Sequence, residues 1–200
     1  MSINKYVGDY HLTEEFDGKG RIHHTLSYIG KPYFFDAEPD EVIRGRKRLI
    51  VMCAAAFAVY LAAMVPASDM MHYFYVSLPF AFCAVPLFLL IKTLLSVPAT
   101  AQKLAQPLER RQADRISNSI PQYSVFLMVL AAGALAGTAI AWIRNIIAGD
   151  DPGTVMTDRF SGNLVFTAMA SALAVLAVMI FRKRSVLSVH EQEVISGQDD

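Results

Sequence analysis

Residues 123–143 read YSVFLMVLAAGALAGTAIAWI, and this stretch decides the class of the protein. It runs for 21 residues without a single Asp, Glu, Lys or Arg. An α-helix rises about 1.5 Å per residue and the hydrocarbon core of a bilayer is about 30 Å thick, so roughly 20 apolar residues cross it. The stretch therefore predicts a transmembrane helix.

Three more runs share this property, at residues 49–65, 73–91 and 164–181. A core helix of a soluble protein is usually shorter and keeps a polar stripe, which these runs lack. The first run follows 48 mostly polar residues, so it is not expected to be a cleavable signal peptide. The sequence predicts an all-α membrane protein, with a four-transmembrane-helix bundle over residues 37–184.

Basic residues alternate across the four predicted spans. Twelve lie directly before the first span, between the second and third, and directly after the fourth: Arg44, Arg46, Lys47, Arg48, Lys92, Lys103, Arg110, Arg111, Arg115, Arg182, Lys183 and Arg184. The other two connections hold only Arg144 and Arg159. Because Lys and Arg are retained on the cytoplasmic side, this bias predicts a multi-pass protein of the cell membrane with both termini in the cytoplasm.

Most of these basic residues are expected to contact the anionic headgroups of the lipid bilayer. The set comprises Arg46, Lys47, Arg48, Arg110, Arg111, Arg115, Arg182, Lys183 and Arg184. Between the second and third spans, apolar residues recur at multiples of four, namely Leu104, Leu108, Ile116 and Ile120. This spacing predicts an amphipathic loop helix, interrupted near Pro107, that lies either on the headgroups or in solvent.

Residues 1–36 are predicted to form a small cytoplasmic β-meander. Apolar residues alternate through Tyr10–Phe16 and again through residues 21–28, and a third short strand follows at Tyr33–Phe35. The Asp17-Gly18 pair between the first two strands is a typical hairpin turn. Three short strands need a covered face, which either the end of the bundle or another protein would supply. Residues 185–200 are polar and are predicted to be a disordered tail.

Three histidines fall on the predicted hairpin: His11, His23 and His24. A turn centred on residues 17–18 would place His11 beside His24, whereas one centred on residues 18–19 would place His23 opposite Glu14. Neither register supplies further metal ligands, so the histidines are expected to be surface residues, and no cofactor or metal is predicted. Cys53 and Cys83 lie inside apolar runs and are expected to be free thiols.

The third predicted span carries small residues at four-residue intervals: Gly133, Gly137 and Ala141. Such a stripe lets two helix backbones approach closely in lipid. It predicts either a homodimer or packing of the third helix on the fourth within one chain, and we favour packing within the chain.

The second span contains Pro79 and Pro86, each of which removes a backbone hydrogen bond and is expected to kink the helix. Broken helices line the binding sites of many transporters. Transporters also tend to hold ionisable residues at mid-membrane, and this span has none. The kinked helix therefore predicts at most a carrier or channel for an uncharged substrate.

The sequence lacks the catalytic and nucleotide-binding motifs of several common enzyme classes. The chain has no P-loop, no Gly-x-Ser-x-Gly, no His-Glu-x-x-His and no paired CxxC. Its net charge is zero, which gives no indication of nucleic-acid binding. We expect a non-enzymatic accessory or scaffolding subunit whose meander and basic loop contact a membrane-protein partner or a second copy. The alternative is a small oligomeric transporter or channel that uses the kinked second helix.

Overall fold

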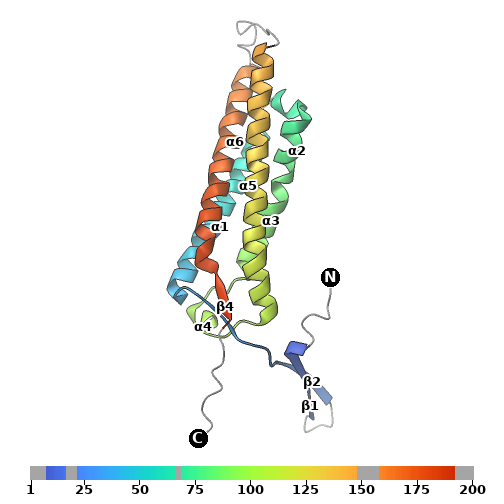
Figure 1. Ribbon diagram of the computed structural model, residues 1–200, viewed down its shortest axis with the longest axis vertical. Coiled ribbons are helices and arrows are strands. Elements are labelled where there is room, and N and C mark those ends of the chain that lie inside the picture. The colour runs from blue at the N-terminus through green and yellow to red at the C-terminus, as the bar shows by residue number, and fades with distance from the viewer. Residues whose placement is uncertain (1–7, 17–21, 66–68, 148–157, 192–200) are drawn as a thin grey trace.

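The computed structural model describes residues 8–16, 22–65, 69–147 and 158–191, and it is mostly helical (Figure 1). Three helical stretches are long and apolar enough to cross a membrane: Phe74–Ser96, Arg110–Ile147 and Ser161–Leu187, of 23, 38 and 27 residues. This result agrees with the predicted class of a multi-pass membrane protein.

Helix α1 spans Pro39–Ala63 and runs unbroken from the strands into the bundle. Pro39, Asp40 and Glu41 occupy its first turn, where proline and acidic residues favour a helix start. After Arg48 the helix continues only to Ala63, about 22 Å at 1.5 Å per residue. Since this is shorter than a hydrocarbon core of about 30 Å, α1 is not among the three spans. It packs along α6 and α3.

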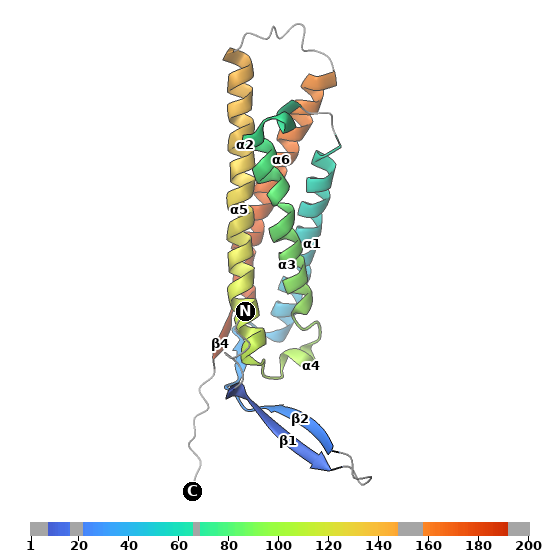
Figure 2. The same ribbon diagram turned by 90° about the vertical axis from the view of Figure 1, so that its right-hand side faces the viewer.

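The second predicted span is divided into α2, Phe74–Phe82, and α3, Ala84–Ser96 (Figure 2). Instead of a kink at each proline, the helix breaks once, at Cys83, between Pro79 and Pro86. The Cys83 amide donates to the Phe80 carbonyl at 3.1 Å, a tightened final turn. A short 3₁₀ turn, Asp69–His72, precedes α2.

The predicted loop helix is not a separate element. A single turn, α4 (Ala101–Leu104), is followed by α5, which begins at Arg110 and continues without interruption to Ile147. At about 57 Å, α5 exceeds the thickness of the hydrocarbon core and extends beyond it. The predicted apolar face, Leu104, Leu108, Ile116 and Ile120, is 2–6% exposed. It is buried against the protein rather than on headgroups, because the other helices supply an apolar partner at this end.

Helix α6, Asp158–Lys183, is followed by a 3₁₀ turn, Arg184–Leu187, and by strand β4, Val189–Glu191. The predicted disordered tail is therefore wrong for residues 185–191, while residues 192–200 lie outside the described part of the chain. Gly45 of α1 leaves room for this turn, because a Cβ at Gly45 would lie 2.7 Å from Val186 Cγ1. The turn packs directly on the backbone of α1.

The strands form two separate pairs. Strand β1 (Tyr10–Phe16) pairs antiparallel with β2 (Ile22–Tyr28), and β3 (Tyr33–Phe35) pairs antiparallel with β4. The predicted three-stranded meander is therefore wrong. Phe35 of β3 lies opposite Val189 of β4, and both pack against the core of the bundle, which draws β3 away from the hairpin.

The hairpin register differs from both predicted registers. His11 lies opposite Ser27, His24 opposite Glu14, and His23 opposite Glu15. The two strands are joined by residues 17–21, a longer connection than a two-residue turn, and the predicted Asp17-Gly18 turn lies outside the described residues. The side chains of His23 and His24 also lie outside the described part.

The core of the bundle runs between the helices and contains an aromatic cluster. The ring of Phe80 lies 5.0 Å from that of Tyr60 and 5.1 Å from that of Phe166, joining α2 to α1 and α6. Cys53 and Cys83 are free and buried, as predicted.

Candidate interaction site at the strand-bearing end of the bundle

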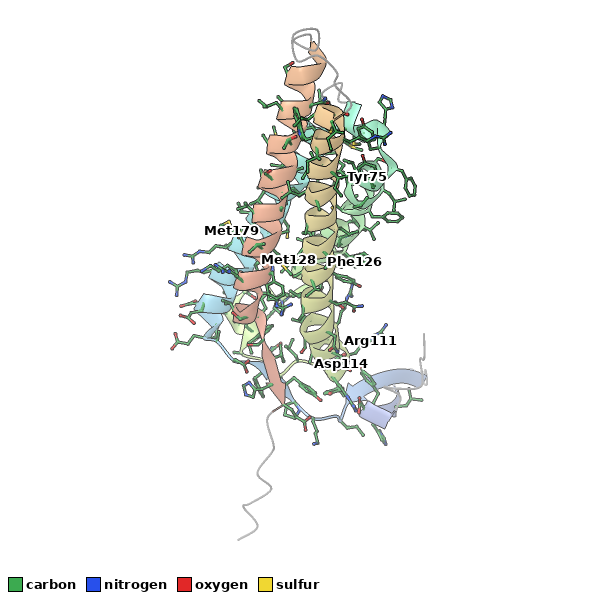
Figure 3. The ribbon with its side chains drawn as sticks, turned by 45° about the horizontal axis from the view of Figure 1, so that its top comes forward. Tyr75, Arg111, Asp114, Phe126, Met128 and Met179 are labelled. Carbon is green, nitrogen blue, oxygen red and sulfur yellow. The ribbon has the colours of Figure 1, made fainter. Side chains whose placement is uncertain are left out.

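The small residues of α5 pack against α2, not against α6 as predicted. A Cβ at Gly133 would lie 3.6 Å from Pro79 Cβ, and one at Gly137 would lie 2.6 Å from the carbonyl oxygen of Tyr75. Ala141 is fully buried on the same helix. Helix α2 of the same chain therefore covers both glycines. This contact lies near the end of the bundle where Figure 3 labels Tyr75.

Helices α5 and α6 also pack on each other, and a side-chain hydrogen bond joins them. The Trp142 indole donates to Thr167 Oγ1 at 2.9 Å, and the Thr167 hydroxyl donates to the Asn163 carbonyl at 2.8 Å. Within the described residues, the buried polar side chains are Thr93, Ser124, Thr138 and Asn163. None of the four is ionisable, so these groups offer no acid or base to a reaction.

The opposite end of the bundle brings together three segments that are far apart in the sequence: residues 31–36, 108–110 and 188–191, which we call the three-segment junction. Tyr33 and Leu108 exchange backbone hydrogen bonds of 3.3 and 2.8 Å. On the other side of Tyr33, β3 pairs with β4, and the Asp36 amide donates to the Ser188 carbonyl at 3.1 Å. The junction joins the strands, the connection into α5 and the end of α6.

Charged and polar side chains line the β3–β4 pair. Lys31 pairs with Glu191, which also accepts a hydrogen bond of 3.2 Å from the Tyr33 hydroxyl. His190 Nδ1 lies 2.5 Å from Asp36 Oδ1. Hydrogen bonding from Ser188, helped by His190, lowers the pKa of Asp36, and Lys31 lowers the pKa of Glu191. Both carboxylates are thereby favoured in their charged form.

Among the described residues, the β1–β2 hairpin is fastened to the junction at its base. The Tyr10 hydroxyl donates to Glu109 at 2.6 Å, and the backbone amide of Arg110 donates to the Tyr28 hydroxyl at 2.9 Å. The two tyrosine rings meet edge to face, 5.4 Å apart. The hydrogen bond to Glu109 and partial burial raise the pKa of Tyr10 to about 12, so the hydroxyl stays a donor.

Beyond this base the hairpin projects away from the helices (Figure 2). Leu12 is 52% exposed, and its neighbours His11 and Thr13 are exposed as well. Of the predicted apolar face, Tyr10 and Tyr28 are half-buried in the base, whereas the side chains of Phe16, Ile22 and Leu26 lie outside the described part. The sequence indicated the hairpin but not which residues anchor it.

The basic residues predicted to contact headgroups divide into two groups. Three make contacts within the protein: Arg46 donates to the Leu94 carbonyl at 3.0 Å, Arg184 donates to the Pro121 carbonyl at 3.1 Å, and Arg110 lies 3.8 Å from Asp9. The side chains of the others are exposed at the strand-bearing end, where Figure 3 labels Arg111: Lys47, Arg48, Arg111, Arg115, Arg182 and Lys183.

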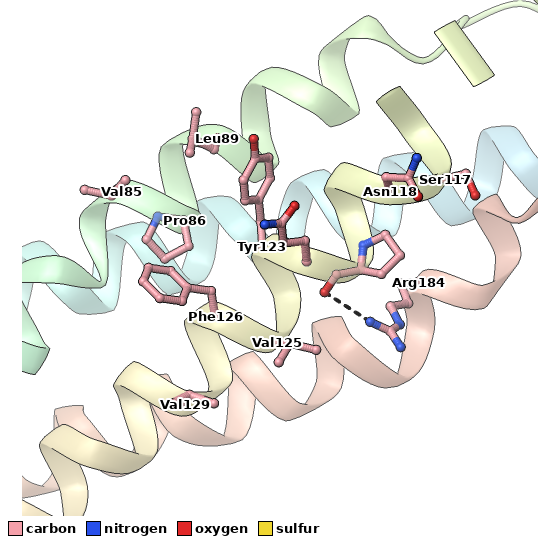
Figure 4. Close-up of a pocket in the computed structure, with 12 residues that line it drawn as sticks. Val85, Pro86, Leu89, Ser117, Asn118, Tyr123, Val125, Phe126, Val129 and Arg184 are labelled. Atoms are coloured by element: carbon pink, nitrogen blue, oxygen red, sulfur yellow. Dashed lines mark hydrogen bonds between the residues drawn. The ribbon is translucent and has the colours of Figure 1, made fainter. Parts of the chain in front are cut away.

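A groove of about 720 Å³ lies over α5 between α3 and the end of α6 (Figure 4). Its walls are Val85, Pro86 and Leu89 of α3, Arg184 beyond α6, and Ser117, Asn118, Pro121, Gln122, Tyr123, Val125, Phe126 and Val129 of α5. Sequence reasoning missed this groove, because its residues come from three segments and show no common spacing.

Comparisons of the chain with protein-family models, with curated proteins and with solved structures gave no match. The assignment of a function therefore depends on the geometry of the strand-bearing end and of the groove.

Proposed function

We propose that the chain is a non-enzymatic membrane protein that recruits a partner protein through its β1–β2 hairpin and the adjoining basic residues. The observation that carries this proposal is the position of the hairpin, which is attached to the bundle by Tyr10 and Tyr28 and otherwise extends away from it. A hairpin in this position presents its faces and edges to other molecules.

The physical chemistry of the hairpin supports the same function. A two-stranded hairpin is marginally stable by itself in water, so its exposed surface gains from being covered. In the described part of the chain, β1 pairs only with β2, which leaves the outer edge of each strand available for pairing with a partner strand. Leu12 offers an apolar contact, and the exposed Arg111 and Arg115 at the start of α5 favour an acidic surface on the partner.

The proposal includes a topology of four spans, with α1 as the shortest and with both termini in the cytoplasm of the cell. Helix α1 packs along α6 and α3, which are parts of two membrane-spanning stretches, and this position supports a fourth crossing. The excess of Lys and Arg in the terminal and middle segments supports the cytoplasmic placement of the hairpin.

The experiment compares two neighbouring substitutions on β1. Tagged full-length protein is purified in mild detergent from cells that express it naturally, as wild type, Leu12→Lys and Thr13→Lys. Successive residues of a strand point to opposite faces, so the two variants add the same charge to different faces. We expect the partner that co-purifies with wild type to be lost with Leu12→Lys and retained with Thr13→Lys.

Two outcomes would contradict the proposal. One is a wild-type chain that purifies alone as a single monomeric species. The other is a partner that both variants retain, and that also survives deletion of residues 9–29, since the hairpin would then take no part in binding.

A transporter or channel is the second candidate, and the break at Cys83 between α2 and α3 is the observation that favours it. Pro86 has no N–H, so the Phe82 carbonyl beside the break lacks its helical donor and is available to a substrate. The buried polar side chains of the described residues are uncharged, so this candidate is limited to an uncharged substrate. We rank it below the recruiting function.

A further inference from the structure

The groove over α5 changes in polarity along its length. Next to the strand-bearing end it is lined by Arg184 and by the exposed polar residues Ser117, Asn118 and Gln122. Towards the middle of the bundle its walls are apolar, ending at Val129 on α5 and Val85 on α3. On α5 the apolar lining residues Pro121, Val125 and Val129 recur every four positions and extend about 12 Å along the helix.

The polar part of the groove holds both a cation and a backbone acceptor. The guanidinium of Arg184 lies over the Phe181 ring, 4.0 Å from its centre, and uses one N–H on the Pro121 carbonyl. A guanidinium has five N–H donors, so several remain for an anion. Pro121 lies inside α5 and has no N–H, which deprives the Ser117 carbonyl of its helical donor. That carbonyl can accept a hydrogen bond from a ligand.

We propose that this groove binds one anionic glycerophospholipid from the leaflet at the strand-bearing end. The phosphate would lie on Arg184, a headgroup hydroxyl would donate to the Ser117 carbonyl, and an acyl chain would follow Val125 and Val129. Charge complementarity selects this occupant: the described residues that line the groove include the cation Arg184 and no acidic side chain.

The dimensions of the groove fit the same ligand. Its volume of about 720 Å³ lies within the range of pockets that bind small molecules, roughly 300–1,000 Å³. The apolar wall belongs to a membrane-spanning stretch, Arg110–Ile147, so lipid is the molecule that reaches it at the highest concentration. A second copy of the chain would meet the charge of Arg184, for which the described groove lining offers no carboxylate and which an apolar helix surface cannot neutralise.

The test is native mass spectrometry of the full chain in mild detergent, with added phosphatidylglycerol or phosphatidylcholine. We expect wild type to retain one phosphatidylglycerol per chain in preference to phosphatidylcholine. Arg184→Gln should reduce this preference by about tenfold, the loss expected for one charge-assisted contact. Arg182→Gln removes the same charge from an exposed neighbour outside the groove and should change the preference little.

A second pair of variants leaves Arg184 intact. Val129→Trp fills the apolar end of the groove and should abolish retention, whereas Val178→Trp places the same ring on exposed α6 and should not. Glycerol 3-phosphate, which has headgroup chemistry without acyl chains, should not displace the lipid. The proposal is overturned if Arg182→Gln and Arg184→Gln act equally, if Val129→Trp retains the lipid, if glycerol 3-phosphate displaces it, or if a second copy occupies the groove.

Discussion

At the scale of single residues, Pro79, Tyr75 and Gly137 act together where α2 meets α5. Pro79 has no N–H, so the Tyr75 carbonyl lacks the helical donor that would normally lie four residues ahead. The backbone of α5 approaches this same carbonyl at Gly137, where a side chain would lie 2.6 Å from the oxygen. A glycine allows the approach because it has no Cβ, and Cα–H groups of close-packed helices can contact such an oxygen.

This contact predicts different effects of two Gly→Ala substitutions on one helix. Gly137→Ala should lower the free energy of unfolding by about 1–3 kcal/mol, because its methyl group would overlap a backbone atom that cannot move aside. Gly133→Ala, which meets Pro79 at an ordinary 3.6 Å, should be neutral or stabilising by up to about 1 kcal/mol. Reversible unfolding in mixed micelles measures both, and equal effects would contradict the packing.

At the scale of elements, the β3–β4 pair ties the segment before α1 to the segment after α6. Three residues of each strand pair within the described part of the chain, and two side-chain pairs flank them, Asp36 with His190 and Lys31 with Glu191. These ion pairs are exposed, and each contributes little by itself. The pair is therefore expected to open more readily than the bundle.

The lowered pKa of Asp36 predicts how this pair responds to acid. Because the folded state favours the carboxylate, the contribution of Asp36 is complete above its ordinary pKa of 3.8 and is lost as the pH falls through the lower, folded-state value. Amide exchange by NMR, corrected for the intrinsic effect of pH, reports the protection of the Asp36 amide. We expect constant protection from neutral pH to about pH 4 and a decline below it.

The control for this prediction is Asp36→Asn, which cannot become charged. Its amide should be less protected at neutral pH and should show no decline on acidification. A variant that retains full protection, or a wild type whose protection falls already between pH 7 and pH 5, would show that the carboxylate does not hold the strands together.

Another feature at this scale is the length of α5. The predicted span begins at Tyr123, after the charged residues of the loop. The helix itself begins earlier, at Arg110, and includes those charged residues. The helical backbone can continue unchanged from the hydrocarbon core into water. Charged residues therefore indicate where the membrane ends, not where the helix ends.

At the scale of the whole molecule, the long helices lie side by side along one axis, with packed neighbours antiparallel, and the strands gather at one end (Figures 1 and 2). Helix α1 contacts α6 and α3, and α5 contacts α2, α3 and α6. The apolar part of α1 is about 22 Å long, which a bilayer can accommodate by local thinning and by extension of its flanking basic side chains.

The proposed topology predicts the accessibility of single cysteines in a chain whose Cys53 and Cys83 are replaced by Ala. Cysteines placed at residues 19, 112 and 198 should react with an impermeant reagent only from the cytoplasmic side. Those placed at residues 68 and 152 should react only from outside. Cytoplasmic labelling at residue 152 would disprove the four-span topology. If α1 does not cross while the other three stretches do, residues 19, 68 and 152 should be labelled on one side and residues 112 and 198 on the other.

The sequence by itself determined those features that depend on a residue and its near neighbours. The absence of charge over residues 123–143 was enough to predict a span, because hydrocarbon thickness sets the required length. Alternation in Tyr10–Phe16 was enough to predict a strand. The thiols of Cys53 and Cys83 were expected to be buried for the same local reason.

Only the tertiary structure decided which surfaces meet. The edge of β3 could pair with β2 or with any other strand, and it pairs with residues more than 150 positions away because Phe35 and Val189 share the core of the bundle. The small residues Gly133 and Gly137 could have packed against any helix, and they pack against α2. There Pro79 leaves the Tyr75 carbonyl without a helical donor. An apolar face or a free edge is a local property, whereas its partner is selected by all the contacts that the packed chain makes at once.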